Sequence, residues 1–452
     1  MSTARVDAVR EGSALVRDPG SLELWERSLA RSRQPRRPTE FGRRAGRRRN
    51  SVSVAVGAVV AAGPVLAQAI VAARSSSDCD RGFWHRFVSP GGARWSALCA
   101  LALLLIGACE SLVWSGGALG AELQAPASAT RLLGQRIMVG LPGTSPDAGL
   151  LAQVRAGEVG AVILFSENVS SQQQLKALTG ALQRAARQGG NPPLLIAVDQ
   201  EGGQIKRLPA GPPFLSPPQI AASGSVQVAA TQGSATGRYL KRLGINMDLA
   251  PVVDVPTFPR AFIWQEGRAF SFSASAVARY ATAFAVGLQA GAVAATAKHF
   301  PGVGSGAVDT DYRLEELDPT AAQRAAALQP YRELVPRGLD AVMVSTAGFP
   351  AYDPSGTVAA LSRPIIEGLL RGRLKFGGVA ITDALESPTG HDEITAGVLA
   401  AEAGADILLY TDSAPGELRA LETAFQHGQI TRAQATVSYR RIVALKQRLA
   451  GS

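Results

Sequence analysis

The hydrophobic pattern of the chain changes near residue 130. From there to the C-terminus, short apolar runs rich in β-branched residues alternate with longer, Ala-rich stretches of helical character. Such alternation is typical of parallel strands joined by crossover helices. It predicts eight strands, at 136–140, 161–165, 194–198, 247–252, 294–298, 341–345, 378–382 and 407–410.

The number of these strands indicates the fold class. Eight strand–helix units in roughly 320 residues have the size and count of a TIM (β/α)₈ barrel. A doubly wound sheet is the alternative, but it more often has about five to seven strands. We therefore predict an α/β fold with a TIM barrel over 130–452.

The chain before the barrel has a different composition. Residues 1–50 hold 13 arginines against 6 acidic residues, so most of the formal net charge of +10 lies there. The arginines at 43–49 precede an apolar run, which favours a cytoplasmic flank under the positive-inside rule. A solvated, disordered tail is the alternative. A nucleic-acid-binding arm is least favoured, so no nucleic-acid partner is predicted.

Two apolar runs follow this basic segment. The first, 51–73, is long enough to span a bilayer. The second, 97–108, has the length of a signal-peptide core, and its end at Cys109 resembles the lipobox of bacterial lipoproteins. Region 51–115 is thus predicted to be a signal or anchor. Either Cys109 is lipidated after cleavage or a transmembrane helix tethers the chain, and a misassigned start codon is compatible with both. The barrel is then membrane-anchored or exported and faces outside.

The stretch 116–129 is rich in Gly, Ala, Ser and Pro and is predicted to link this region to the barrel. The three cysteines, Cys79, Cys99 and Cys109, all precede the barrel. No disulfide framework or thiolate metal site is therefore expected there. The barrel has to be stabilised by its apolar core.

Polar residues gather where the predicted strands end, which is where barrel enzymes hold their active sites. A strand cap or a surface salt bridge would explain any one of them, but less readily a whole convergent set. The set includes Asp199, Asp254 and Asp383, one after each of three predicted strands. No phosphate-binding glycine loop and no metal motif is found, so no cofactor is predicted and hydrolysis through carboxylates is the simplest interpretation. Glycoside cleavage is such a reaction, because it needs one carboxyl group at the anomeric carbon and a second to protonate the leaving oxygen.

The motifs at these strand ends resemble, in order and spacing, those of the N-terminal barrel of glycoside hydrolase family 3. The resemblance covers about 132–450 and rests on Asp199-Gln200-Glu201-Gly202-Gly203, Ala250-Pro251-Val252-Val253-Asp254, Lys298-His299-Phe300-Pro301-Gly302, Leu361-Ser362-Arg363 and Ile381-Thr382-Asp383. Many members have a further α/β domain, whereas this sequence ends with the barrel. In that respect it is similar to the bacterial β-N-acetylhexosaminidases, which act on muropeptides and other N-acetylglucosamine-capped glycans.

The resemblance implies roles for individual residues. Asp383 would be the nucleophile that forms a glycosyl-enzyme. The positions that bind the sugar hydroxyls and the N-acetyl group would be Asp199, Arg207, Arg268, Lys298 and His299. For Arg268, a salt bridge to a neighbouring carboxylate is the alternative interpretation.

One loop departs from the hexosaminidase pattern. That branch has an Asp-Ser-His triplet with a catalytic His, whereas this chain reads Asp309-Thr310-Asp311. Val303 and Thr346 also stand where that branch has, or often has, a His. In an extended loop Asp309 and Asp311 would share one face, and their repulsion would raise the pKa of one carboxyl.

Asp311, supported by Asp309, is therefore the predicted acid/base, with Glu315 or Glu316 as alternatives. An anionic Asp311 would repel phosphate, so water is the expected acceptor. The predicted function is retaining hydrolysis of terminal N-acetylglucosamine from cell-wall fragments, such as muropeptides, or from other glycans. The alternatives are a β-glucosidase-type hydrolase of the same family and a catalytically silent glycan-binding barrel.

Overall fold

The structure is a computed structural model that describes residues 128–410 and 416–451. The predicted basic segment, the two apolar runs and the lipidation site at Cys109 lie outside these residues. The described residues belong to one compact unit, 119–452. Within the described ranges, no helix is both long and apolar enough to cross a membrane.

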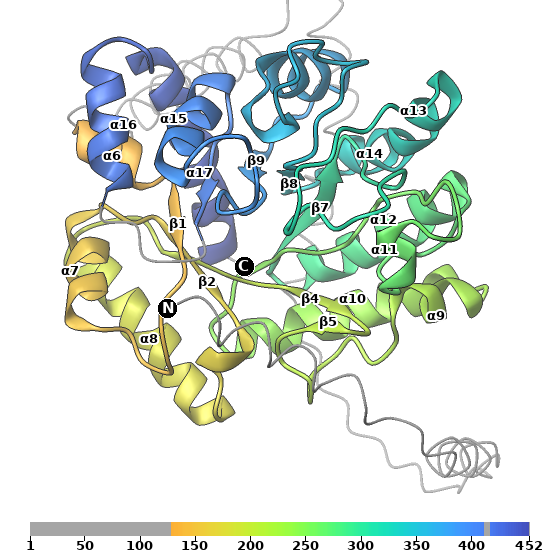
Figure 1. Cartoon of the computed structure of the whole chain (residues 1–452). Helices are drawn as coiled ribbons and strands as arrows, with labels where there is room; N and C mark the ends of the chain where they lie inside the picture. The colour runs from red at the N-terminus through yellow and green to blue at the C-terminus, as the bar shows by residue number, and fades with distance from the viewer. Residues whose placement is uncertain (1–127, 411–415, 452) are drawn as a thin grey trace, which may run out of the picture. The chain divides into compact units, whose positions relative to one another are not determined.

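Eight parallel strands form the centre of this unit (Figure 1). They pair in the order β10-β1-β2-β3-β6-β7-β8-β9. A parallel bridge between Ile381 and Ile407 joins β9 to the residue before β10, which closes the sheet into the predicted barrel. The strands are β1 (Ile137–Val139), β2 (Ala161–Leu164), β3 (Leu195–Val198), β6 (Met247–Asp248), β7 (Ala294–Phe300), β8 (Ala341–Val344), β9 (Val379–Thr382) and β10 (Leu408–Leu409).

Helices surround the strands (Figure 1). Many begin at a Ser, Thr or Asp whose side chain accepts a hydrogen bond from a free amide of the first turn, as Ser171, Ser273 and Thr431 do. The α-helices are α6 (Ala129–Gly134), α7 (Ala148–Ala156), α8 (Gln172–Gln188), α9 (Pro217–Ala222), α10 (Val226–Arg242), α11 (Phe262–Gln265), α12 (Ala274–Ala290), α13 (Ala321–Ala327), α14 (Gln329–Leu334), α15 (Glu393–Ala403), α16 (Glu417–Gln426) and α17 (Arg432–Ala450), and a π-helix spans Pro364–Arg373.

Three details of the strands differ from the prediction. Strand β6 ends at Asp248 rather than at residue 252, and Pro251 in the excluded part has no N–H to donate to a strand ladder. Strand β7 continues two residues further than expected, to Phe300. After β3, the chain forms a hairpin that was not predicted, made of β4 (Gln200–Gly202) and β5 (Ile205–Lys206).

The apolar core has two layers. Successive strand residues point alternately into the barrel and out toward the helices. In β2, for example, Ile163 belongs to the interior cluster, whereas Val162 and Leu164 pack in the outer one. Met247 and Met343 also fill the interior. The interior of the barrel is therefore a packed core.

Helices α10 and α12 approach so closely that only a residue without a side chain fits where they touch. A Cβ atom on Gly233 would lie 2.1 Å from the carbonyl oxygen of Phe284. We expect Gly233→Ala to push the helices apart and to lower the free energy of unfolding by about 2 kcal/mol, measured by thermal unfolding. Gly180→Ala in α8 is the matched control, because its Cβ would meet only a flexible guanidinium nitrogen at 3.2 Å. A similar Tm for both variants would contradict this packing.

Helix α17 covers the amino-terminal end of the barrel. Its Leu445 and Leu449 belong to the interior cluster. Next to them, Lys446 is 1% exposed, and its Nζ donates to Gln135 Oε1 at 2.6 Å and to the Gly160 carbonyl at 2.7 Å. Burial lowers the pKa of Lys446 to about 7.

This buried lysine predicts a pH dependence of stability. Lysine in the unfolded chain has a pKa of about 10.4. Between about pH 7 and that value, this lysine is protonated in the unfolded chain but neutral in the folded one. The free energy of unfolding therefore increases as the pH rises through this window and decreases as the pH is lowered toward about 7. Relative to Lys446→Met, the wild type should gain about 1.4 kcal/mol of unfolding free energy per pH unit in this window. Urea unfolding at fixed ionic strength measures how the free energy of unfolding changes with pH in the wild type and in Lys446→Met. Equal slopes for the two proteins would refute the prediction.

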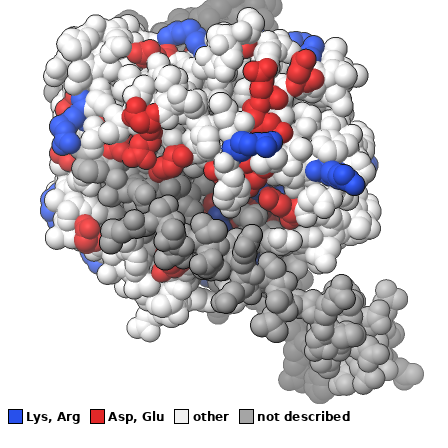
Figure 2. Space-filling view, in the orientation of Figure 1, with Lys and Arg blue, Asp and Glu red and all other residues white. Residues whose placement is uncertain are grey.

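The surface carries charges of both signs. On the face drawn in Figure 2, acidic side chains form clusters, whereas basic side chains lie at separate positions. This distribution agrees with a sequence whose excess of arginine lies in residues 1–50.

Candidate active site

A cavity of about 320 Å³ opens where the barrel strands end in Asp199 and Asp383. Its apolar lining includes interior residues of the barrel, among them Ile163, Leu249 and Met343. The structure brings together all eight residues that the sequence predicted for catalysis or sugar binding. The cavity is lined by Asp199, Arg207, Arg268, Lys298, His299, Asp309, Asp311 and Asp383.

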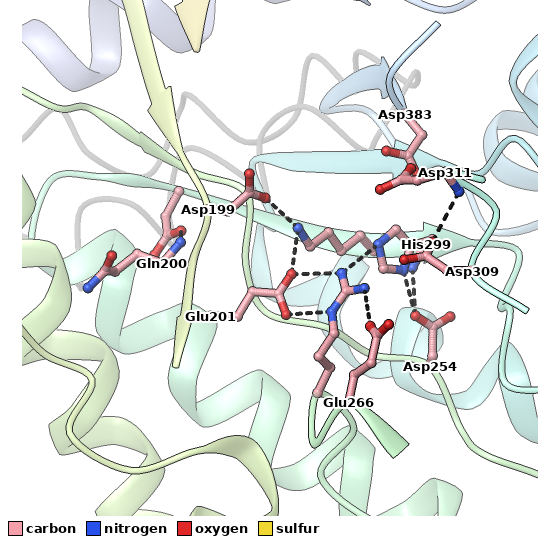
Figure 3. Close-up of polar contacts among 12 residues, drawn as sticks. Asp199, Gln200, Glu201, Asp254, Glu266, His299, Asp309, Asp311 and Asp383 are labelled. Carbon is pink, nitrogen blue, oxygen red and sulfur yellow. Dashed lines mark hydrogen bonds and ion pairs between the residues drawn. The ribbon is translucent and has the colours of Figure 1, made fainter. Parts of the chain in front are cut away.

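The hairpin after β3 positions two carboxylates. Asp199 and Glu201 face the other site residues, whereas the Gln200 side chain points away from them (Figure 3). Gln200 is held there because its Nε2 donates to the carbonyls of Leu208 and Pro212, at 3.0 and 2.9 Å. Glu201 belongs to the motif that begins at Asp199, but no role was predicted for it from the sequence. The two-residue period of an extended chain would have placed it beside Asp199.

Two buried cations hold these carboxylates. Lys298 Nζ lies 2.7 Å from Asp199 Oδ1 and 2.8 Å from Glu201 Oε1. Arg268 donates from Nε and Nη2 to the two Glu201 oxygens, each at 2.9 Å. Arg207 Nη2 lies 3.5 Å from the second oxygen of Asp199. The result is an ion-pair network, shown in Figure 3.

The network keeps both carboxylates ionised. Burial alone would raise the pKa of Glu201, but Arg268 and Lys298 outweigh it and lower that pKa to about 2. Burial is likewise outweighed at Asp199, whose pKa is lowered by Lys298 and Arg207. At neutral pH Asp199 can therefore accept hydrogen bonds from sugar hydroxyls, whereas both oxygens of Glu201 already accept from Arg268.

Arg268 fits both interpretations that the sequence left open. It lines the cavity, and it forms salt bridges with Glu201 and with Glu266, whose Oε2 lies 3.2 Å from Nη1. Glu266 also lines the cavity and was not predicted. No sequence signal identifies it, because it follows the short helix α11 rather than a strand.

His299 is fixed by a carboxylate behind it. Its Nδ1 lies 2.7 Å from Asp254 Oδ2, and Asp254 also accepts the amide N–H of Val303 at 2.8 Å. Arg268 Nη2 lies 3.2 Å from Nε2 of His299. Because a guanidinium only donates, Nε2 accepts and Nδ1 carries the hydrogen. Burial lowers the pKa of His299, but the charge of Asp254 outweighs this effect and raises it.

The loop with Asp309 and Asp311 is a turn, so the expectation of an extended segment was wrong. Asp309 accepts the amide N–H of Asp311 at its Oδ1, at 3.0 Å, and that of Tyr312 at its carbonyl, at 3.2 Å. The Ser387 hydroxyl donates to Asp311 Oδ1 at 3.1 Å. Both aspartates still line the same cavity.

Asp311 lies beside Asp383 (Figure 3). Burial raises the pKa of Asp383, and the charge of Asp311 adds to this effect against the opposing influence of His299. Desolvation and the charge of Asp309 raise the pKa of Asp311. Two neighbouring carboxyl groups of this kind lose their protons in separate steps, so one is charged while the other is still neutral.

The alternative acids, Glu315 and Glu316, have other contacts. Glu315 accepts the amide N–H groups of Ala307 and Val308, at 3.2 and 3.4 Å, and so supports the loop from behind. Glu316 forms a backbone bridge with Gly348. Neither glutamate is among the residues that line the cavity. Over the described residues, no group of three or more His, Cys, Asp or Glu side chains is placed to hold a metal ion.

Comparison with known proteins agrees with this geometry. Residues 132–445 match the glycosyl hydrolase family 3 N terminal domain. A secreted glycosyl hydrolase of Arthroderma benhamiae is 36% identical over 347 residues, which are 73% of this chain and 97% of that protein. A β-hexosaminidase of Idiomarina loihiensis is 32% identical over 298 residues, 64% of this chain and 87% of its own length.

Solved structures give the same result. A β-N-acetylhexosaminidase from Beutenbergia cavernae has a TM-score of 0.66 at 32% identity, covering 72% of this chain and 100% of that one. A family 3 β-N-acetylglucosaminidase from Paenibacillus has a TM-score of 0.69 at 34% identity, covering 72% of this chain and 63% of that one. This chain thus spans under two thirds of the Paenibacillus enzyme.

The fold, the site and these similarities define the class of the protein, which is a glycoside hydrolase. Because the family match covers more than half of the sequence, the chain belongs to glycosyl hydrolase family 3.

Proposed function

We propose that this chain is a retaining exo-β-glycosidase that removes terminal N-acetylglucosamine from glycans. The observation that carries the mechanism is the pair of neighbouring carboxyl groups, Asp311 and Asp383, next to the ion-pair network. The sugar is inferred from the β-hexosaminidases and the β-N-acetylglucosaminidase that this chain is similar to.

In the first step the Asp383 carboxylate attacks the anomeric carbon. A C–O bond to Asp383 forms while the bond to the leaving oxygen breaks, and the Asp311 carboxylic acid gives that oxygen its proton. In the second step the Asp311 carboxylate removes a proton from water. The water oxygen attacks the anomeric carbon, and Asp383 is released as a carboxylate.

The remaining side chains bind and orient the sugar. Asp199 would accept from hydroxyl groups, and Arg207 and Lys298 would donate to hydroxyls or to the N-acetyl carbonyl. His299, whose Nδ1–H is held by Asp254, would contact the sugar through the acceptor Nε2. Arg268 and Glu201 hold Lys298 and His299 in place, so the binding groups do not have to reorganise during the reaction. Asp309 stabilises the turn that carries Asp311.

The site of action is proposed to be outside the cytoplasm. The predicted signal or anchor region at 51–115 supports export, and so does the secreted Arthroderma relative. Cell-wall fragments and extracellular glycans are the substrates that such a location offers.

The test is hydrolysis of an aryl β-N-acetylglucosaminide and an aryl β-glucoside by the full chain. We expect cleavage of the former, with water rather than phosphate as acceptor. Cleavage of the glucoside alone would replace the proposal with the β-glucosidase alternative. Binding of N-acetylglucosamine oligomers without cleavage of either compound would favour the catalytically silent barrel.

A further inference from the structure

The loop that carries Asp311 borders the leaving-group side of the cavity. This placement rests on the proposed function, in which Asp311 protonates the leaving oxygen. Asp309, Thr310 and Tyr312 line the cavity next to it. These side chains therefore face the group to which the terminal sugar is attached.

The charges in the cavity are unevenly distributed. Each Lys and Arg among its lining residues is held in an ion pair. The pairs are Arg207 with Asp199, Lys298 with Asp199 and Glu201, and Arg268 with Glu201 and Glu266. These three cations balance three carboxylates. The other acidic lining residues are Asp309, Asp311 and Asp383. Because Asp383 attacks the sugar from the face opposite the leaving group, Asp309 is the residue that keeps the leaving-group side negative while Asp311 holds its proton.

An exposed aromatic ring lies on the same loop. Tyr312 is 77% exposed and lines the cavity, whereas the next residue, Arg313, does not line it. The turn is fixed by the hydrogen bond from the Tyr312 amide to Asp309 and by the contact of Asp311 with Ser387. The ring is thus presented at the cavity by an ordered segment. A flat aromatic face packs well against the C–H groups of a second sugar ring.

We propose that the leaving-group site binds an uncharged pyranose against Tyr312 and disfavours a sugar that carries a carboxylate. The sequence predicted cell-wall fragments or other N-acetylglucosamine-capped glycans as substrates. This selection favours the second group, in the form of neutral β-linked N-acetylglucosamine oligomers. Glycans in which the next sugar is a muramic acid with a free lactyl carboxylate are selected against, because that carboxylate meets Asp309.

Two disaccharides test the charge selection with the full chain. Both carry the same terminal β-N-acetylglucosamine, attached in one to N-acetylglucosamine and in the other to N-acetylmuramic acid. At low salt we expect kcat/KM to favour the neutral disaccharide at least about tenfold. The preference should shrink toward about threefold at 1 M salt, where the Debye length falls to about 3 Å. Asp309→Asn should also reduce the preference for the neutral disaccharide. The asparagine Oδ1 can still accept the Asp311 amide N–H, so the turn is kept. Equal or better cleavage of the anionic disaccharide would overturn the proposal.

The role of the ring is tested with a substrate that has no second sugar. Tyr312→Ala should lower kcat/KM for the neutral disaccharide about fivefold, and Tyr312→Phe should not. Neither variant should change the hydrolysis of the β-N-acetylglucosaminyl fluoride, because its leaving group does not reach Tyr312. Phe214→Ala is the matched control, since Phe214 is 68% exposed but does not line the cavity.

The outcomes separate this proposal from the function on which it rests. If the fluoride is cleaved and Tyr312→Ala acts equally on fluoride and disaccharide, the stacking proposal fails and the proposed function stands. If the wild type cleaves neither the fluoride nor either disaccharide, the proposed function fails and the leaving-group site with it.

Discussion

Asp383→Asn should lower kcat for an aryl β-N-acetylglucosaminide by at least about 10⁴-fold. The amide oxygen cannot form the glycosyl-enzyme, so the first step is lost. The fold should be unaffected, because Asn keeps the oxygen that accepts the Ala384 amide N–H. Steady-state kinetics and thermal unfolding measure the two effects. Asp353→Asn is the matched control, since Asp353 is buried but does not line the cavity.

Chemical rescue distinguishes a lost nucleophile from a general loss of activity. In Asp383→Ala, azide should occupy the space of the carboxylate and restore turnover with an activated substrate. A single displacement then gives the α-glycosyl azide. Formation of the β-glycosyl azide, or no rescue together with residual activity above about 1% of wild type, would contradict the assignment of Asp383.

Asp311→Asn should have the second largest effect, and the effect should depend on the leaving group. For an alkyl glycoside, whose oxygen needs a proton, we expect kcat/KM to fall by about 10²–10⁴-fold. For the dinitrophenyl glycoside, which leaves without help, the first step should change little. The variant should also lose the alkaline limb of the pH profile, because the raised pKa of Asp311 sets the pH above which the acid is deprotonated.

Glu315→Gln is the control for Asp311. Glu315 supports the same loop through two backbone amides but does not line the cavity. Its replacement should affect both leaving groups alike and should leave the pH profile in place. If Glu315→Gln shows the leaving-group dependence and Asp311→Asn does not, the acid has been assigned to the wrong residue.

The positions of the strands could be predicted because each barrel strand is a short apolar run between polar ends. All eight predicted strands are present, and closure through Ile381 and Ile407 follows from their number. The hairpin after β3 could not be predicted, since its polar residues are stabilised by the Gln200 side chain rather than by burial of apolar surface. The short β6 depends on Pro251, a signal that the sequence did contain.

The site was predictable where a residue directly ends a strand. Asp199 and Asp383 are of this kind, and the barrel itself brings them together. Residues that act through another side chain were harder to recognise. The role of Asp254, which is to hold the His299 ring, follows from the contact between the two side chains in the structure and not from the sequence. The conformation of the Asp309 loop is set by local hydrogen bonds that the hydrophobic pattern does not encode.

The most direct test is to identify the residue that becomes glycosylated. The full chain is incubated with a fluorinated N-acetylglucosaminyl fluoride that forms the glycosyl-enzyme faster than water removes it. The protein is then digested and its peptides are analysed by mass spectrometry. We predict the mass of one sugar on the peptide that contains Asp383, and none in Asp383→Asn. A sugar on a different carboxylate, or full turnover of normal substrate with no labelled peptide, would contradict the proposed mechanism.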